Sequence, residues 1–222
     1  VEALNENLDV EIDDYVAVNW KAVADAINLL GGIDMELTES EFRYINGYIT
    51  STVEGTGVGS VQLKKPGLNH LDGVQTVAYA RLRYMDSDFQ RTERQREVIS
   101  KALEKAKSAD LSVLYQILNS VLPQTKSSLE TDSLLPLLQS ISKFHLEAAS
   151  GFPFDLEAKR IEENGMEIDY VFPVNLADDV AELHKFLYDT EDYQVSEQVK
   201  EISQAIQEKS KKKRVSRTSA AK

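Results

Sequence analysis

Five arginines and two aspartates lie within residues 79–96 of a chain that is otherwise strongly acidic. Arg81 and Arg83 are separated by one residue, and residues i and i+2 of an extended segment share a face. Apolar residues fill the alternate positions: Ala80, Leu82 and Tyr84. The alternation predicts a short strand that presents two guanidinium forks side by side. Such forks match phosphate oxygens in a way that the point charge of lysine does not.

A helix predicted over 87–109 adds polar side chains to the same region. Asp88, Arg91 and Gln95 lie at i, i+3 and i+7, so they share one helical face. The N-cap is expected at Ser87 or Asp88. The unpaired N–H groups and the dipole of a helix N-terminus favour an anion. The segment therefore predicts a pocket for phosphate.

A second interpretation stays open on composition and spacing alone. Asp88 would then be only a helix cap, and the helix would carry a solvated face of paired charges. In either interpretation Arg94 and Arg96 are expected to face solvent beside the glutamates that neighbour them, Glu93 and Glu97. Spacing does not decide between an anion pocket and a solvated helix.

The elements around the cluster indicate an α/β protein. Residues 12–20 read as a buried strand, 20–32 as a helix stopped by Gly31 and Gly32, and 33–37 as a second strand. A strand, a helix and a strand in so short a stretch predict a crossover unit of an α/β sheet.

The rest of the chain alternates between helical and extended patterns. A capping-box pattern at Thr38 and Glu41 predicts a short helix and then a mobile glycine-rich loop within 38–60. Residues 61–80 predict a short strand, a Pro-Gly turn and a helix that begins near 71–73. The predicted helix over 87–109 has an apolar face of Val98, Ile99, Ala102 and Leu103. The remaining predictions are helices at 111–122, 131–143 and 175–189, strands at 144–152 and 166–174, and a polar helical tail over 190–222.

Composition excludes several classes of function. The 222 residues carry a net charge of −12 and no cysteine, which excludes disulfides and thiolate chemistry. Residues 209–222 hold seven Lys and Arg, so the other 208 residues carry −19 and would repel nucleic acid over most of their surface. The histidines, His70, His145 and His184, lack metal-ligand spacing. No apolar run reaches the roughly 18 residues of a membrane span.

Three stretches of the chain together resemble one family. They are "VNWKAVADAINLLGGIDMEL", "GLNHLDGVQTVAYARLRYMDSDFQRTERQREVISKAL" and the late "VFPVN…LHKFLYD". In order and spacing they resemble the LytR-CpsA-Psr family of bacterial cell-envelope proteins across roughly residues 1–190. The resemblance implies a phosphotransferase that moves a teichoic acid or capsular polysaccharide from an undecaprenyl-pyrophosphate carrier to peptidoglycan.

The resemblance also implies an architecture and a location. The fold would be a three-layer α/β/α sandwich with a central mixed sheet and a hydrophobic groove for the polyprenyl chain. Residues 1–189 would be the C-terminal portion of the catalytic domain, and 190–222 a tail with a basic, disordered end. The family implies a single-pass membrane anchor, an extracellular catalytic domain and Mg²⁺, and we expect the anchor, several strands and the metal ligands in a segment that precedes this chain.

The family's roles carry over to five residues. Arg81 and Arg83 resemble the paired arginines that grip the pyrophosphate, and Arg91 resembles a third pyrophosphate ligand. Gln95 resembles a neighbouring polar contact, and Asp88 resembles the acid that acts as, or assists, the general base. The catalytic candidates are therefore Asp88 and Arg83.

Two other functions stay open beside the transferase. One is a polyprenyl-phosphate-binding regulatory protein of the transcriptional-attenuator type, without turnover. The other is nucleic-acid binding through the basic tail, which the acidic body disfavours. The glycopolymer and its acceptor position are not encoded in any motif that we recognise.

Overall fold

The chain divides into two compact units in a computed structural model that describes residues 1–83 and 88–211, without the side chains of Asp88 and Thr131. The larger unit is Asp14–Ala149, and the smaller one joins Val1–Asp13 to Ser150–Lys222. Each unit has its own buried apolar cluster. The candidate site belongs to the larger unit.

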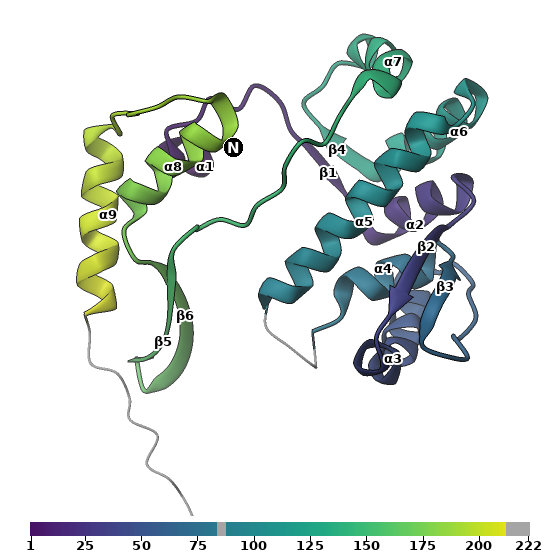
Figure 1. Cartoon of the computed structure of the whole chain (residues 1–222), viewed down its shortest axis with the longest axis horizontal. Helices are drawn as coiled ribbons and strands as arrows, with labels where there is room; N and C mark the ends of the chain where they lie inside the picture. The colour runs from purple at the N-terminus through teal and green to yellow at the C-terminus, as the bar shows by residue number, and fades with distance from the viewer. Residues whose placement is uncertain (84–87, 212–222) are drawn as a thin grey trace, which may run out of the picture. The chain divides into compact units, whose positions relative to one another are not determined.

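The larger unit is built mainly from helices with short strands between them (Figure 1). Its elements in chain order are β1 (Val16–Val18), α2 (Trp20–Leu29), β2 (Ile33–Leu37), α3 (Glu39–Thr56), β3 (Gly67–Leu71), α4 (Gly73–Arg81), α5 (Asp88–Ser108), α6 (Leu111–Val121), η1 (Leu122–Gln124), β4 (Thr125–Ser127), α7 (Thr131–Ser140) and η2 (Ile141–Lys143).

The strands of the larger unit form two antiparallel pairs. β1 pairs with β4, and β2 pairs with β3 in a register that runs from Ile33↔Leu71 to Leu37↔Gly67. The mixed α/β class is confirmed. The crossover unit predicted over 12–37 is wrong, because β1 and β2 belong to different sheets. The predicted buried strand at 12–20 is also wrong in extent and burial, since β1 has three residues and all are exposed.

Helix α4 lies at the centre of the larger unit's core. It packs against α2, α3 and α5, and all of its residues from Gly73 to Tyr79 are buried. The side chain of Asp72 accepts from the backbone of Gln75, and the side chain of Gln75 accepts from the backbone of Asp72, so the predicted start near 71–73 is confirmed. No strand forms at 61–66, and β3 follows the Pro-Gly turn instead.

Helix α3 is longer than predicted. The capping box of Thr38 and Glu41 is confirmed, with the Glu41 carboxylate 2.9 Å from the Thr38 backbone nitrogen. The whole helix has 18 residues, from Glu39 to Thr56, and it is followed by Gly57, whose φ is +71°. Ile45, Ile49 and Thr52 recur at helical spacing and are buried, so packing outweighs the glycines that predicted a loop.

Arg94 fastens α5 to the neighbouring helices. Its Nη2 donates to the carbonyl oxygen of Leu82 at 2.8 Å, and its Nη1 lies 3.4 Å from a carboxylate oxygen of Glu41. Its guanidinium is buried, so the prediction that Arg94 faces solvent is wrong. Val98 is buried as predicted, whereas Ile99 is exposed. The buried face of α5 therefore includes the charged side chain of Arg94 as well as the apolar side chain of Val98.

The smaller unit pairs a hairpin with helices. Its elements are α1 (Glu2–Leu8), β5 (Leu156–Glu163), β6 (Met166–Pro173), α8 (Leu176–Tyr188) and α9 (Glu197–Ser210). The helix predicted at 175–189 is confirmed and is capped by Asn175. The strand predicted at 144–152 is wrong, because this segment forms no ladder and β5 begins only at Leu156.

Helix α9 belongs to the core of the smaller unit. It packs against α8 and α1, and its Val199 is buried in one cluster with Leu176 and Val180. Lys209 is the first residue of the basic segment 209–222, and its Nζ lies 3.4 Å from a carboxylate oxygen of Glu163. Residues 212–222, which hold most of that run, lie outside the described part.

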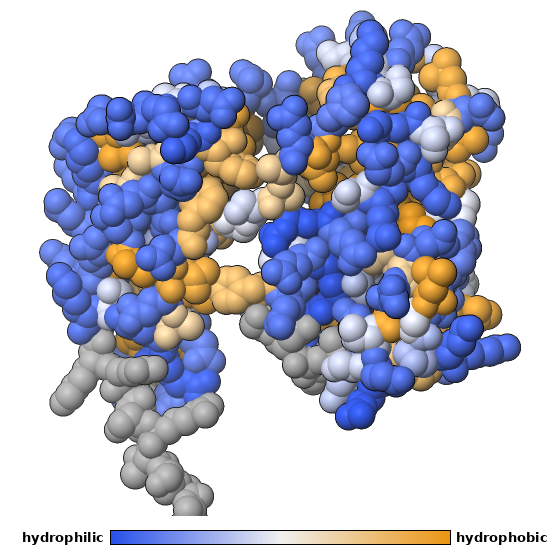
Figure 2. All heavy atoms as spheres, viewed as in Figure 1, coloured by the Kyte–Doolittle hydropathy of each residue, from blue (hydrophilic) through white to orange (hydrophobic). Residues whose placement is uncertain are grey.

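Apolar side chains also reach the surface of the larger unit (Figure 2). Those on and near α5, α6 and α7 that are exposed are Phe89, Ile99, Leu111, Tyr115, Leu135, Leu137, Phe144 and Leu146. Along the described ranges, however, no helix is both long enough and apolar enough to cross a membrane.

We expect Gly73→Ala to destabilise the larger unit strongly. A Cβ at this position would lie 1.9 Å from the carbonyl oxygen of Ala24 on α2, and backbone cannot yield as a flexible side chain can. The free energy of unfolding should fall by about 3 kcal/mol in urea titrations. Gly47→Ala in α3 is the matched control, because its Cβ would meet no atom within 4 Å. It should stabilise by about 0.5–1 kcal/mol, and equal losses in both variants would refute the close-approach argument.

We also expect Arg94→Met to lower the free energy of unfolding by about 3 kcal/mol, because it leaves the Glu41 carboxylate buried without its cation. Adding Glu41→Gln should restore part of the loss, since the uncompensated charge is removed. Lys101→Met is the control: Lys101 pairs with Glu97 at 3.9 Å on the surface, and its loss should change stability by less than about 0.5 kcal/mol. An Arg94→Met variant as stable as the control would contradict the buried pair.

Candidate functional site

The two leading arginines differ in backbone conformation. Arg81 is the last residue of α4, and the chain turns extended only at Leu82, whose ψ is 129°. The short strand predicted over this segment is therefore wrong. Because α4 is buried on nearly all sides, its sequence carries little helical periodicity, and the apolar alternation at its end resembled a strand.

The guanidinium of Arg81 is held by an aromatic ring and two hydroxyls. Its Cζ lies 3.7 Å from the ring centroid of Trp20, and its Nη1 donates to Thr52 Oγ1 at 2.6 Å and Ser51 Oγ at 3.4 Å. Tyr48 lies farther away, 5.9 Å from ring centroid to Cζ. Partial burial lowers the pKa of Arg81, but an arginine stays charged at neutral pH. The guanidinium of Arg81 is therefore a positive charge that the Trp20 ring and the two hydroxyls hold in place.

Arg83 follows two residues after Arg81, beyond the end of α4. Its backbone N–H donates to the hydroxyl oxygen of Tyr48 at 3.2 Å, and its side chain is exposed. Tyr48 thus lies beside both arginines: its ring approaches Arg81, and its hydroxyl fixes the backbone of Arg83. The two arginines rest on a helix end and a tyrosine instead of a strand, and their role in binding pyrophosphate stays a prediction.

Helix α5 brings Gln95 to the same helix end. The Gln95 side chain donates from Nε2 to the carbonyl oxygen of Ala80 at 3.3 Å, next to Arg81 in sequence. Arg91, one turn earlier on α5, is half-buried. Asp88 is the first residue of α5, but its side chain lies outside the described part, as does Ser87. The roles predicted for Asp88 and Arg91 stay predictions.

Trp20, Tyr48 and Thr52 are the residues that the sequence did not single out. Trp20 opens the helix predicted over 20–32, and it is 50% exposed. It directly follows Asn19, whose side chain caps α2 by accepting from Ala22 N at 2.8 Å. A large aromatic residue in the first turn of a capped helix was the only available signal, and it does not specify a partner.

A hollow of the larger unit beside Tyr79 of α4 is richer in carboxylates than the surroundings of Arg81. It has a volume of about 440 Å³ and is lined by Thr38, Ser40, Glu41, Tyr79, Gln90, Glu93, Arg94 and Glu97. The Tyr79 hydroxyl donates to Glu97 at 3.0 Å, and burial raises the pKa of this tyrosine. Three carboxylates against one arginine would repel phosphate. The surface around Arg81 is the better anion site.

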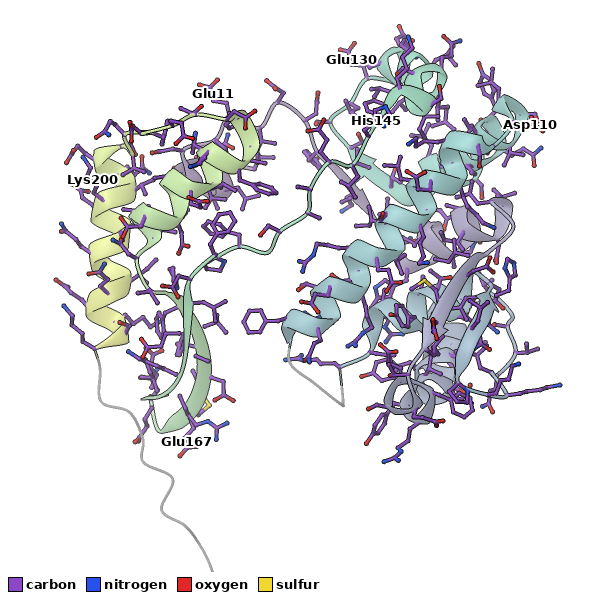
Figure 3. All side chains as sticks on the ribbon, viewed as in Figure 1. Glu11, Asp110, Glu130, His145, Glu167 and Lys200 are labelled. Carbon is purple, nitrogen blue, oxygen red and sulfur yellow. The ribbon has the colours of Figure 1, made fainter. Side chains whose placement is uncertain are left out.

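The chain's own residues do not form a metal centre in the described ranges. There, no three His, Asp or Glu residues gather within reach of one ion, and arginine has no lone pair to donate to a metal. The ring nitrogens of His70 are hydrogen-bonded, Nδ1 to Asp34 Oδ1 at 2.6 Å and Nε2 to the Gly31 carbonyl oxygen at 2.7 Å. His145 is exposed (Figure 3), and His184 stacks on Tyr193 at 3.6 Å between ring centroids. The described residues around Arg81 thus supply a cation and hydrogen-bonding groups, and no cluster of metal ligands occurs among the described residues.

Comparison with known proteins agrees with the family that the sequence resembles. The profile of the LytR_cpsA_psr family matches residues 1–180. The chain is 27% identical over 180 residues to the polyisoprenyl-teichoic acid–peptidoglycan teichoic acid transferase TagT of Bacillus subtilis, covering 76% of this chain and 53% of the relative. It is 31% identical over 156 residues to biofilm regulatory protein A of Streptococcus mutans, covering 64% of this chain and 34% of the relative. The chain thus spans about a third to a half of these relatives.

Solved structures share the fold. The crystal structure of B. subtilis TagT aligns with a TM-score of 0.59 and 26% identity, covering 84% of this chain and 66% of that one. The structure of TagT bound to LIIa-WTA aligns with a TM-score of 0.59 and 26% identity, covering 85% and 65%. These likenesses, with the profile match over 1–180, confirm the predicted family: the chain belongs to the LytR-CpsA-Psr family.

Proposed function

We propose that this chain is part of a phosphotransferase that moves a glycopolymer of the teichoic acid or capsular polysaccharide type from an undecaprenyl-pyrophosphate carrier to peptidoglycan. Relatives named as teichoic acid–peptidoglycan transferases support the class of reaction. The observation that carries the proposal is the fixed guanidinium of Arg81, with Arg83 two residues beyond it at a surface that α5 borders.

The chemistry requires cations at that surface. A sugar hydroxyl of the acceptor attacks the phosphorus atom next to the glycopolymer, a new P–O bond forms, and the bond to the bridging oxygen breaks. Polyprenyl phosphate leaves with the negative charge, and the hydroxyl proton passes to a base, for which Asp88 is the proposed group. Arg81, Arg83 and Arg91 would neutralise the phosphoryl and leaving oxygens, and positioning and electrostatics supply most of such catalysis.

The carrier lipid sets the proposed location. A polyprenyl chain stays in the membrane because burying each CH₂ group is favourable. We propose that the protein works at the outer face of the cytoplasmic membrane, the location that its family implies. The exposed apolar residues of α5, α6 and α7 offer a surface for the lipid. The Mg²⁺ expected for the family finds no ligand set among the described residues, so no step here depends on it.

A regulatory role without turnover is the second candidate. It is favoured by the resemblance to biofilm regulatory protein A, which is 31% identical over 156 residues. Such a protein would bind the polyprenyl-pyrophosphate carrier through the same arginines. Binding therefore cannot separate the two functions, and only transfer can.

We expect Arg83→Ala to reduce glycopolymer transfer by about 10²–10³-fold, as loss of a donor that stabilises developing charge does elsewhere. The assay would use the full-length protein, a polyprenyl-pyrophosphate-linked glycopolymer and peptidoglycan, and would measure polymer attached to peptidoglycan. Arg43→Ala is the matched control, since Arg43 is an exposed arginine near the start of α3. It removes the same charge away from Arg81 and should leave transfer within about twofold.

Each result of this assay has a definite meaning. Unchanged transfer by Arg83→Ala would refute the pyrophosphate site. Binding of the carrier without transfer by the unaltered protein would refute the transferase and favour the regulatory role. Equal losses in the Arg43 and Arg83 variants would show a general effect of positive charge and would contradict a specific site.

A further inference from the structure

The Arg81 guanidinium is held from two directions, and this arrangement leaves one edge for a ligand. The Trp20 ring covers a face of the guanidinium, 3.7 Å from ring centroid to Cζ. Both hydrogen bonds of the Arg81 side chain within the described residues use Nη1. Nε and Nη2 therefore have no hydrogen-bond partner among the described residues. Two parallel N–H groups at one edge are the geometry with which arginine grips phosphate.

We infer that Trp20 and Thr52 are positioning residues that hold Arg81 for the pyrophosphate of the carrier, an inference that rests on the proposed function. Trp20 sets the plane of the guanidinium, and Thr52 sets its rotation within that plane. Neither needs to touch the ligand. Their effect passes through Arg81.

The Thr52 hydroxyl is itself fixed in direction. Its side chain is fully buried, and its Oγ1 donates to the carbonyl oxygen of Tyr48 at 2.7 Å. The hydroxyl proton is thus used within α3, so a lone pair of Oγ1 faces Nη1 of Arg81 at 2.6 Å. Because the buried hydroxyl of Thr52 both donates one hydrogen bond and accepts another, its oxygen is a rigid acceptor for Arg81.

The Trp20 ring is likewise fixed by the backbone around it. The capped start of α2 places it, and two ring carbons, Cε3 and Cζ3, lie 3.8 Å from where a Cβ of Gly55 would be. The ring thus lies close to the last turn of α3 and stacks on Arg81. Half-exposed tryptophan makes a poor core residue but a good platform for a cation, because its ring attracts one most strongly among aromatic side chains.

The competing explanation is that the stack only ties α2 to the end of α4. In that case Trp20 would affect stability, and any change in ligand affinity would not depend on Arg81. A double-mutant cycle separates the two explanations, because residues that act through one another show non-additive effects.

The experiment measures the affinity of the full-length protein for farnesyl pyrophosphate by calorimetry. We expect Trp20→Leu and Thr52→Val each to weaken binding about fivefold to tenfold. Trp20→Phe should stay within about twofold of the unaltered protein, because a stacking ring is retained. In an Arg81→Met background, Trp20→Leu should cause no further loss. Urea unfolding of each variant checks that the fold is kept.

Three results would overturn the inference. If Arg81→Met leaves affinity unchanged, the proposed pyrophosphate site fails, and the inference fails with it. If Arg81→Met weakens binding but Trp20→Leu does not, the positioning role alone is refuted. If Trp20→Leu weakens binding equally in both backgrounds, or Phe fails to rescue, then Trp20 acts by another route and is not a positioning residue for Arg81.

Discussion

The site of the larger unit depends on the contacts made by one buried guanidinium, that of Arg94 on α5. Its contact with Glu41 reaches the start of α3, and its hydrogen bond to the carbonyl oxygen of Leu82 reaches the end of α4. Arg94 thus connects α5 to both of these helices. A buried charge is costly unless its hydrogen bonds are satisfied, so the three elements can assemble well in few arrangements. The conformation of residues 80–83, where the anion site begins, is one consequence of that assembly.

The end of α4 shows how this constraint reaches the site. The last carbonyl groups of a helix have no partner within it. Here α5 supplies partners, as Gln95 donates to the carbonyl oxygen of Ala80 and Arg94 to that of Leu82. Side chains from one helix thereby cap another, and the chain leaves α4 between two fixed carbonyls. Arg81 is consequently held in helical geometry, and the chain leaves the helix at Leu82, whose ψ is 129°.

The sequence predicted the family and many elements, because these depend on local patterns. The capping box at Thr38, the stop at Gly31 and the helix at 175–189 each follow from neighbouring residues. It could not predict which arginines are buried, because the acceptor of Arg94, at Glu41, lies 53 positions away. The stack of Arg81 on Trp20 is equally non-local. Strand pairing failed for the same reason: β1 pairs with β4, far along the chain.

The way in which Arg81 is held bears on how the proposed site would work. Catalysis by electrostatic stabilisation is most effective when the charged groups need not reorganise as charge develops. Arg81 meets that condition, because an aromatic face and two hydroxyls hold its guanidinium within the protein itself. Ordering a long side chain has an entropy cost. An arginine that is already held avoids most of that cost when a ligand binds, so Arg81 is the residue that would set where the proposed pyrophosphate lies.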